Sequence, residues 1–153
     1  MRTKFIPVLF LLSFCFAYAQ QPLTPFEKNK LTTTTYEECI AFYKELAEQS
    51  DRIKVLEYGE SDIGQPVHLV VVSKDGIFDP QEIHKSGKVV LFVNNGIHPG
   101  EPDGVDACMM LVRDLLFPPL LRRGGQGGEA LLDHVVLITI PIYNIGGAMN
   151  RNN

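Results

Sequence analysis

The clearest periodic pattern in the chain begins at Thr35, after which apolar side chains recur every three or four residues. Thr35 can cap a helix, and Glu38, three positions later, completes a capping box. The stripe that follows predicts one buried helical face, formed by Tyr36, Cys39, Ile40, Phe42, Tyr43, Leu46 and Ala47. Core packing is the simplest role for this stripe, so we assign no catalytic role to its tyrosines.

Two segments after this helix carry the shorter period of strands. Residues 52–59, RIKVLEYG, alternate polar and apolar side chains, and residues 66–73, PVHLVVVS, are rich in β-branched ones. Gly64 supplies a turn between them, which predicts a hairpin. His68 is expected to be an ordinary strand side chain, because no carboxylate or second histidine stands at ligand spacing beside it. Residues 73–88, which include His84, are polar and are expected to form a loop.

A strand, a helix and a second strand follow in that order. The apolar run VVLFVNN, residues 89–95, predicts a central strand covered on both faces. Pro102 can open a helix that ends before Pro118 and buries Val105, Cys108, Met109, Val112, Leu115 and Leu116. Residues 135–140 predict a further buried strand, reached by a right-handed parallel crossover. We therefore expect an α/β fold with a mixed, centrally parallel sheet and helices on both faces.

The N-terminus reads as an export signal. Arg2 and Lys4 precede an apolar stretch that ends in Ala17 and Ala19, so residues 1–19 are expected to be a signal peptide rather than a membrane anchor. The product would be secreted or periplasmic, without stable membrane insertion. Residues 20–34 are polar and are expected to form an extended lead-in. The net charge of −4 disfavours a nucleic-acid partner, which needs clustered lysine and arginine.

Cys39 and Cys108 remain after signal cleavage, and each lies among apolar residues of a predicted helix. They could pair in an oxidising compartment or stay as buried free thiols. Neither belongs to a Cys-x-x-Cys unit, so a thiolate zinc site is not indicated. The segment LRRGGQGGE, residues 121–129, lacks the strand and helix context of a phosphate-binding loop.

His98 and Glu101 stand in the loop that follows the apolar run at residues 89–95. Ligands of open α/β sheets bind beyond the carboxyl ends of parallel strands, where this loop is expected. Zinc accepts imidazole nitrogen and carboxylate oxygen, and Pro99 and Gly100 form a turn that can bring both side chains together. The alternative is a surface turn in which Glu101 only stabilises the N-terminus of the next helix.

With these residues in view, the chain resembles the N-terminal part of the secreted zinc metallocarboxypeptidases, the family that includes pancreatic carboxypeptidase A. Three segments carry the resemblance in the family's order: YGESDIGQPVHLVVVS, VNNGIHPGEP and IPIYNIGGAMNRN. The resemblance implies a peptidase that binds one Zn²⁺ ion and cleaves peptides or proteins with a free C-terminus. It implies that His98 and Glu101 are zinc ligands and that Asn144 opens a loop beside the substrate groove.

The sequence also departs from the family. Gly100 stands where many members have an arginine, and Ile145 and Gly146 replace the usual Pro-Asp. The family's third zinc ligand, its carboxylate-binding Asn-Arg pair, its closing tyrosine and its general-base glutamate lie further along, beyond Asn153. His134 precedes its strand and Arg151 follows Asn144 too closely, so neither substitutes for them.

We therefore interpret residues 35–153 as the N-terminal part of a truncated catalytic domain, ending in a polar loop at residues 146–153. On its own it is expected to be inactive. Two rival functions stay open on the sequence alone. One is a related zinc-dependent amide deacylase, and the other is a secreted binding module that keeps the fold without catalysis.

Overall fold

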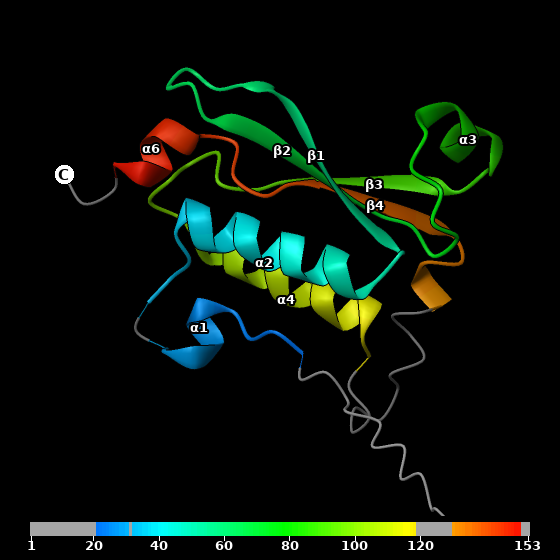
Figure 1. Cartoon of the computed structure of the whole chain (residues 1–153), viewed down its shortest axis with the longest axis horizontal. Coiled ribbons are helices and arrows are strands. Elements are labelled where there is room, and N and C mark those ends of the chain that lie inside the picture. Colours follow the sequence, from blue (N-terminus) through cyan, green and yellow to red (C-terminus); the bar gives the residue numbers. More distant parts are fainter. Residues whose placement is uncertain (1–20, 31, 119–129, 151–153) are drawn as a thin grey trace, which may run out of the picture.

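A computed structural model of the chain describes residues 21–30, 32–118 and 130–150. The elements are α1 (Pro25–Lys28), α2 (Tyr36–Gln49), β1 (Ile53–Glu60), β2 (Pro66–Val72), α3 (Pro80–Lys85), β3 (Val89–Asn94), α4 (Asp103–Leu116), β4 (Val135–Ile140) and α6 (Ile145–Met149) (Figure 1). The expected signal peptide and the glycine-rich segment at 121–129 lie outside the described residues.

The strands form one mixed sheet in the order β1-β2-β4-β3. β1 and β2 make the expected antiparallel hairpin, with Ile53 opposite Val72. β2 also pairs antiparallel with β4. β3 and β4 are parallel, with Val89 opposite Val135, and α4 connects them in the chain. The strand–helix–strand unit expected from the sequence is therefore confirmed.

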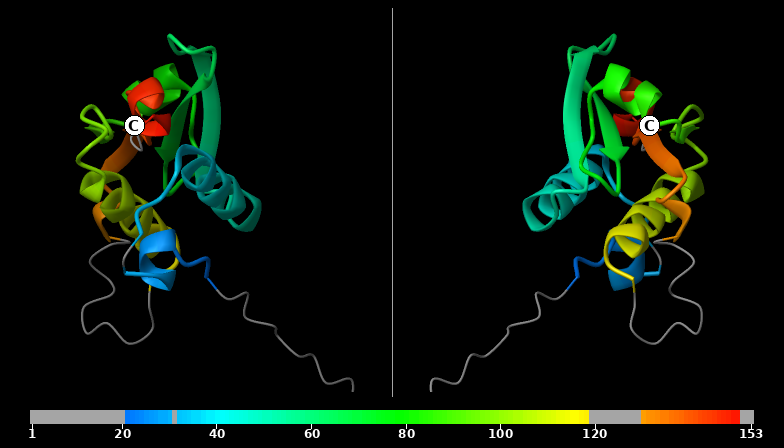
Figure 2. Two further views of the ribbon diagram at one scale, coloured as in Figure 1. Left: turned by 90° about the vertical axis from the view of Figure 1, so that its left-hand side faces the viewer. Right: turned by 90° about the vertical axis from the view of Figure 1, so that its right-hand side faces the viewer.

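The main core lies between the sheet and the two long helices, α2 and α4, which cover the same face (Figures 1 and 2). The capping box of α2 is present: the Thr35 hydroxyl accepts from the Glu38 N–H, and the Glu38 carboxylate accepts from the Thr35 N–H. All six apolar residues expected on the inner face of α4 are buried. Both cysteines belong to this core as free thiols, and burial raises the pKa of the Cys39 thiol far above its usual range.

The opposite face of the sheet carries a smaller apolar cluster. Residues 73–88, which were expected to form a loop, contribute to it. They contain α3, whose Ile83 packs with Val71 of β2 and Val136 of β4. Asp79 caps this helix by accepting from two backbone N–H groups, and Pro80 occupies its first turn. A helix of this length with one buried apolar residue has no periodic stripe, so the sequence pattern did not reveal it. Helices nevertheless lie on both faces, as the fold class required.

β3 differs most from expectation. Within the described residues it is an edge strand, and Val89, Val90, Leu91 and Phe92 are 65%, 47%, 45% and 53% exposed. The expectation of a central strand covered on both faces is therefore wrong for the described part of the chain. An apolar run is typical of a strand that is buried on both faces. It does not indicate which residues bury the strand.

Two short helices replace segments that were expected to be extended or looped. α1 interrupts the lead-in, capped by Thr24 with Glu27 in a second capping box. α6 replaces the start of the polar loop at 146–153, and the Asn144 side chain caps it. Each is about one turn long, and capping residues rather than apolar periodicity define it.

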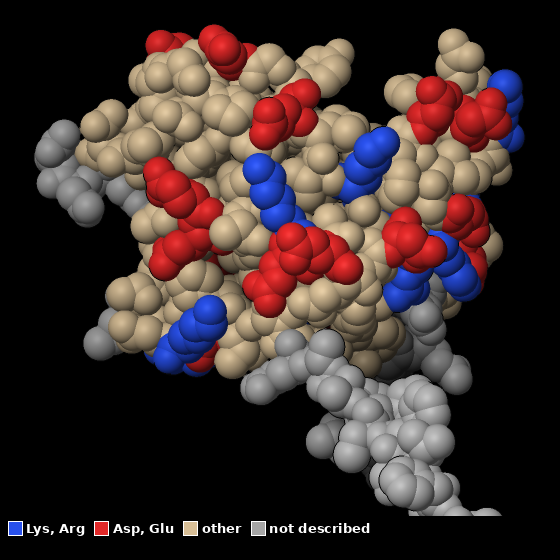
Figure 3. Space-filling view, viewed as in Figure 1, with Lys and Arg blue, Asp and Glu red and all other residues tan. Residues whose placement is uncertain are grey.

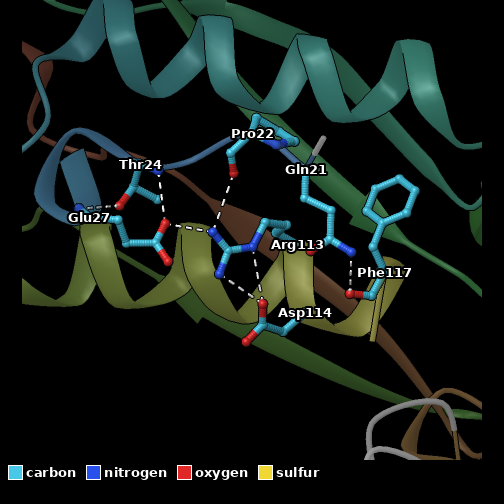
Figure 4. A network of polar contacts seen from close by, with 7 residues as sticks. All are labelled: Gln21, Pro22, Thr24, Glu27, Arg113, Asp114 and Phe117. Carbon is cyan, nitrogen blue, oxygen red and sulfur yellow. Dashed lines mark hydrogen bonds and ion pairs between the residues drawn. The ribbon is translucent and has the colours of Figure 1, made fainter. Parts of the chain in front are cut away.

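A buried polar cluster, here called the Arg113 network, fixes the lead-in to α4 (Figure 4). The Arg113 guanidinium donates to the Glu27 carboxylate at 2.5 Å and to the Pro22 carbonyl at 3.3 Å. It also donates twice to Asp114 Oδ1, at 3.0 and 2.8 Å. Thr24 completes the cluster through its capping box with Glu27. The segment before α2 is therefore packed against the end of α4.

The exposed surface carries charges of both signs close together. On the face seen in Figure 3, acidic and basic side chains lie beside one another, and Lys44 of α2 stands 3.8 Å from Glu57 of β1. Within residues 21–30, 32–118 and 130–150, no helix combines the length and the apolar character that crossing a lipid bilayer requires.

Candidate metal centre

The loop after β3 and the segment after β4 meet at one end of the sheet, because these two strands are parallel. The Tyr143 N–H donates to the Asn95 carbonyl at 2.8 Å, and the Asn144 N–H donates to the Gly96 carbonyl at 3.0 Å. Gly96 has a φ of +62°, and a side chain there would also press on Ile142 at 3.2 Å. His98, Glu101 and Asn144 are thus brought to the same end of the sheet, the position expected for a ligand site.

His98 and Glu101 are joined by a tight turn in which the Glu101 N–H donates to the His98 carbonyl at 3.0 Å. His98 Nδ1 lies 3.9 Å from Glu101 Oε1, and the two side chains are 72% and 80% exposed. Ligand atoms about 2.0–2.2 Å from zinc at a tetrahedral angle stand about 3.3–3.6 Å apart. The observed separation is close enough that small side-chain rotations bring both donors to one ion.

These two side chains line an open cavity of about 510 Å³ together with Asn94, Asn95 and Asp103. The side-chain oxygen of Asn94 is buried and has no hydrogen-bond partner among the described residues. The cavity therefore offers an imidazole, two carboxylates and amide groups to whatever occupies it. The donor types at His98 and Glu101 are those that zinc accepts.

The alternative role of Glu101, as support for the N-terminus of α4, finds little support in the geometry. Pro102 is the N-cap residue and makes no side-chain capping bond. Asp103 and Asp106 already place negative charge in the first turn. Glu101 instead lies beside His98, with its Oε1 3.9 Å from His98 Nδ1.

Asn144 is exposed, and its side chain is engaged in the fold. Its Oδ1 accepts from the Gly147 N–H at 2.9 Å and so caps α6. A Cβ at Gly147 would stand 2.4 Å from Pro99 Cγ, so α6 lies directly against the turn between His98 and Glu101. Sequence reasoning placed Asn144 near the site but missed Gly147, for which the adjacent pair of glycines was the only signal.

A second open cavity, of about 580 Å³, lies beside the same turn. Its lining combines Thr35, Glu37, Pro99, Gly100 and Met149 with neighbouring residues of the lead-in, α2 and α6. Glu37 is the one charged residue in this lining. At Gly100, where many family members have an arginine, this chain has no side chain to place a cation in the cavity.

The other histidines do not approach this centre. The His134 carbonyl accepts from the Val89 N–H, so His134 lies at the amino end of β3 and β4, opposite His98. His68 is buried in β2, where the Tyr36 hydroxyl lies 3.3 Å from its Nδ1. Burial and the nearby Lys44 lower the pKa of His68. In the described part of the chain, no group of three potential ligands is assembled. Arg151 lies outside that part.

Comparison with known proteins shows the family of the chain. Residues 39–152 match the model of the zinc carboxypeptidase family, and the chain belongs to this family. Among curated protein sequences, none matches the chain.

Solved structures share the fold. The chain is similar to the carboxypeptidase A from Helicoverpa armigera, with a TM-score of 0.62 and 20% identity over 80% of this chain. It is also similar to thrombin-activatable fibrinolysis inhibitor, with a TM-score of 0.61 and 19% identity over 76% of this chain. A metallo-carboxypeptidase from Burkholderia cenocepacia has a TM-score of 0.59 and 22% identity over 74% of this chain. In each case the chain spans only 27% of the length of the solved protein.

Proposed function

We propose that this chain supplies part of the metal centre of a secreted, zinc-dependent carboxypeptidase. The observation that carries the proposal is the placement of His98 and Glu101 on one turn at the carboxyl end of β3, with their donor atoms 3.9 Å apart. Family membership adds the reaction class, the hydrolysis of peptide bonds. The proposed substrate is a peptide or protein with a free C-terminus.

The residues of the chain have separate tasks in this proposal. An imidazole nitrogen of His98 and the Glu101 carboxylate would hold the metal, while Pro99 and Gly100 keep them on one turn. A zinc ion held there would lower the pKa of a bound water and polarise the scissile carbonyl. Asn144 caps α6, which lies against Pro99, and in this proposal α6 forms one wall of the substrate groove.

The activity belongs to a larger catalytic unit than the described residues form. A catalytic zinc site uses three protein ligands and one open position. Because the described residues bring two together, we expect the 153-residue chain to bind zinc weakly and to show no carboxypeptidase turnover when expressed alone. Turnover by the purified product that begins at Gln20, above that of its Glu101→Ala variant, would contradict this expectation.

Zinc content of the full-length protein tests the proposed ligands. His98→Ala and Glu101→Ala should each lower bound zinc and peptidase activity. His134→Ala is the matched control, since it removes the same side chain at the opposite end of β4 and should leave both unchanged. Unchanged zinc in the His98→Ala protein would remove this residue from the metal centre.

Export is proposed from residues 1–19 alone. Cleavage after Ala19 would give a product that begins at Gln20, one residue before the described segment. N-terminal sequencing of the exported protein tests this. A mature protein that retains Met1 would contradict both the cleavage site and the proposed route.

The same assays separate the rival functions. Release of C-terminal residues from peptides supports a carboxypeptidase, whereas cleavage restricted to an N-acyl amide supports the deacylase. Zinc binding without hydrolysis of either substrate by the full-length protein supports a binding module.

A further inference from the structure

Asn95 is a buried amide three residues before His98, directly after β3. It is 8% exposed, and its Nδ2 donates to Thr139 Oγ1 of β4 at 3.0 Å. Thr139 is fully buried. An amide and a hydroxyl are costly to bury unless they bond to each other, and an apolar pair of similar shape has no such requirement. The fold therefore keeps a specific polar contact at this point.

This contact stands where three parts of the chain meet. The Asn95 N–H donates to the Ile140 carbonyl at 3.1 Å, which ties it to the end of β4. A Cβ at Gly104 would lie 3.4 Å from Asn95 Oδ1, and Cys108 Sγ lies 3.6 Å from Thr139 Oγ1. The two side chains thus join β3, β4 and the first turns of α4. The His98–Glu101 turn lies between the elements that they join.

His98 and Glu101 have little side-chain packing of their own to hold them. Their side chains are 72% and 80% exposed, and they lie beside each other, with His98 Nδ1 3.9 Å from Glu101 Oε1. Metal ligands commonly depend on neighbouring groups that fix their orientation. In this loop, the backbone on either side of the turn must provide much of that constraint.

We propose that the Asn95–Thr139 hydrogen bond is a positioning contact for the metal centre. It fixes the loop at its start and against α4, and so keeps the His98 and Glu101 donors on the cavity that they share with Asn95. Asn95 and Thr139 act through the loop backbone. The inference rests on the proposed function, because it concerns the geometry of that same metal site.

Two substitutions at one position separate positioning from packing. Thr139→Val keeps the shape and removes the hydroxyl, whereas Thr139→Ser keeps the hydroxyl. Zinc affinity is measured on the full-length protein by competition with a chromophoric chelator, and the melting temperature is recorded in parallel without metal. Thr139→Val should weaken zinc binding about tenfold, the lower end of the effect of such supporting contacts. Thr139→Ser should bind zinc as the wild type does.

The control is Val72→Ala, which truncates a fully buried side chain of β2 away from the loop. It should lower the melting temperature at least as much as Thr139→Val and leave zinc affinity unchanged. The proposal is overturned if Thr139→Val binds zinc as tightly as the wild type, or if Val72→Ala weakens binding equally.

The double variant Asn95→Leu/Thr139→Val gives a second readout. It replaces both polar groups, so it should regain part of the stability lost in Thr139→Val but none of the zinc affinity. Recovery of zinc affinity in the double variant would also overturn the positioning role.

The proposed function fails by a different result. If zinc affinity is unchanged in His98→Ala, the proposed metal centre is wrong. If zinc affinity falls in His98→Ala but is unchanged in Thr139→Val, only the positioning role is wrong.

Discussion

The Arg113 network and the His98–Glu101 pair are both polar, but one is closed and the other is open. Arg113 is 7% exposed, and its bonds go to Glu27, Asp114 and the Pro22 carbonyl (Figure 4). His98 and Glu101 are 72% and 80% exposed and stand 3.9 Å apart. A closed network stabilises the fold, whereas an open pair leaves lone pairs for a ligand. The two regions should therefore respond to mutation in opposite ways.

Removal of the central cation should have the largest effect on stability. Arg113→Met leaves the Glu27 carboxylate without its main partner in a half-buried site, which should lower the free energy of unfolding by about 3 kcal/mol. Urea denaturation at pH 7 measures the loss. The double variant Arg113→Met/Glu27→Gln should recover part of the lost stability. A loss below about 1 kcal/mol in Arg113→Met would show that the Arg113–Glu27 pair contributes no more than an ordinary surface ion pair.

The acid partner should show its contribution as a pH dependence. Burial raises the pKa of Glu27, but the hydrogen bonds from Arg113 and the Thr24 backbone outweigh it, so the pKa lies below the unfolded value of 4.5. The stability that Glu27 contributes is thus complete above pH 4.5 and is lost as pH falls through its folded pKa. Unfolding free energies measured from pH 6 to pH 3 should fall less steeply in Glu27→Gln. Equal slopes would show that Glu27 is not held in the network.

The cap of α1 should have a smaller effect. Thr24→Ala removes the hydroxyl that accepts from the Glu27 N–H at 3.2 Å, which should lower the free energy of unfolding by about 1 kcal/mol. Thr24→Ser keeps the cap and serves as the control in the same denaturation experiment. A serine variant as unstable as the alanine variant would assign the loss to the methyl group of the threonine, which is fully buried.

The open pair should have the smallest effect on stability and the largest on metal binding. His98→Ala changes an exposed side chain, so the free energy of unfolding should stay within about 0.5 kcal/mol of the wild type. Saturating zinc should raise the melting temperature of the wild type but not of this variant, because only a bound native state is stabilised. A large loss of stability in metal-free His98→Ala would mean that the pair belongs to the structural framework.

Local patterns were sufficient to predict much of this fold. The start of α2 follows from a capping box, and the hairpin and β4 follow from alternation and β-branched runs, each of which acts over a few residues. The inner face of α4 was predicted residue by residue, because a helix of four turns repeats its pattern often enough. α1, α3 and α6 were missed, since a single turn depends on caps and one contact.

The sequence likewise predicted part of the candidate site, but not the contact between Asn95 and Thr139. The parallel pairing of β3 and β4 accounts for where His98 and Glu101 lie, and their ligand role stays a prediction. Thr139 was predicted only as part of a buried strand, and Asn95 only as the last residue of the apolar run at residues 89–95. Their contact joins residues 44 positions apart, and a local pattern carries no information about such a pair.

The exposed edge of β3 has a practical consequence for anyone who prepares this chain. Residues 89–94 contain no charged side chain, and four of them expose apolar surface. Among the described residues, β3 pairs with β4 on one side only, and the free edge of such a strand is a template for further strands. Proteins commonly protect such edges with lysine, proline or a covering element. Self-association of the chain should therefore increase with protein concentration, and purification at low concentration should favour recovery of monomers.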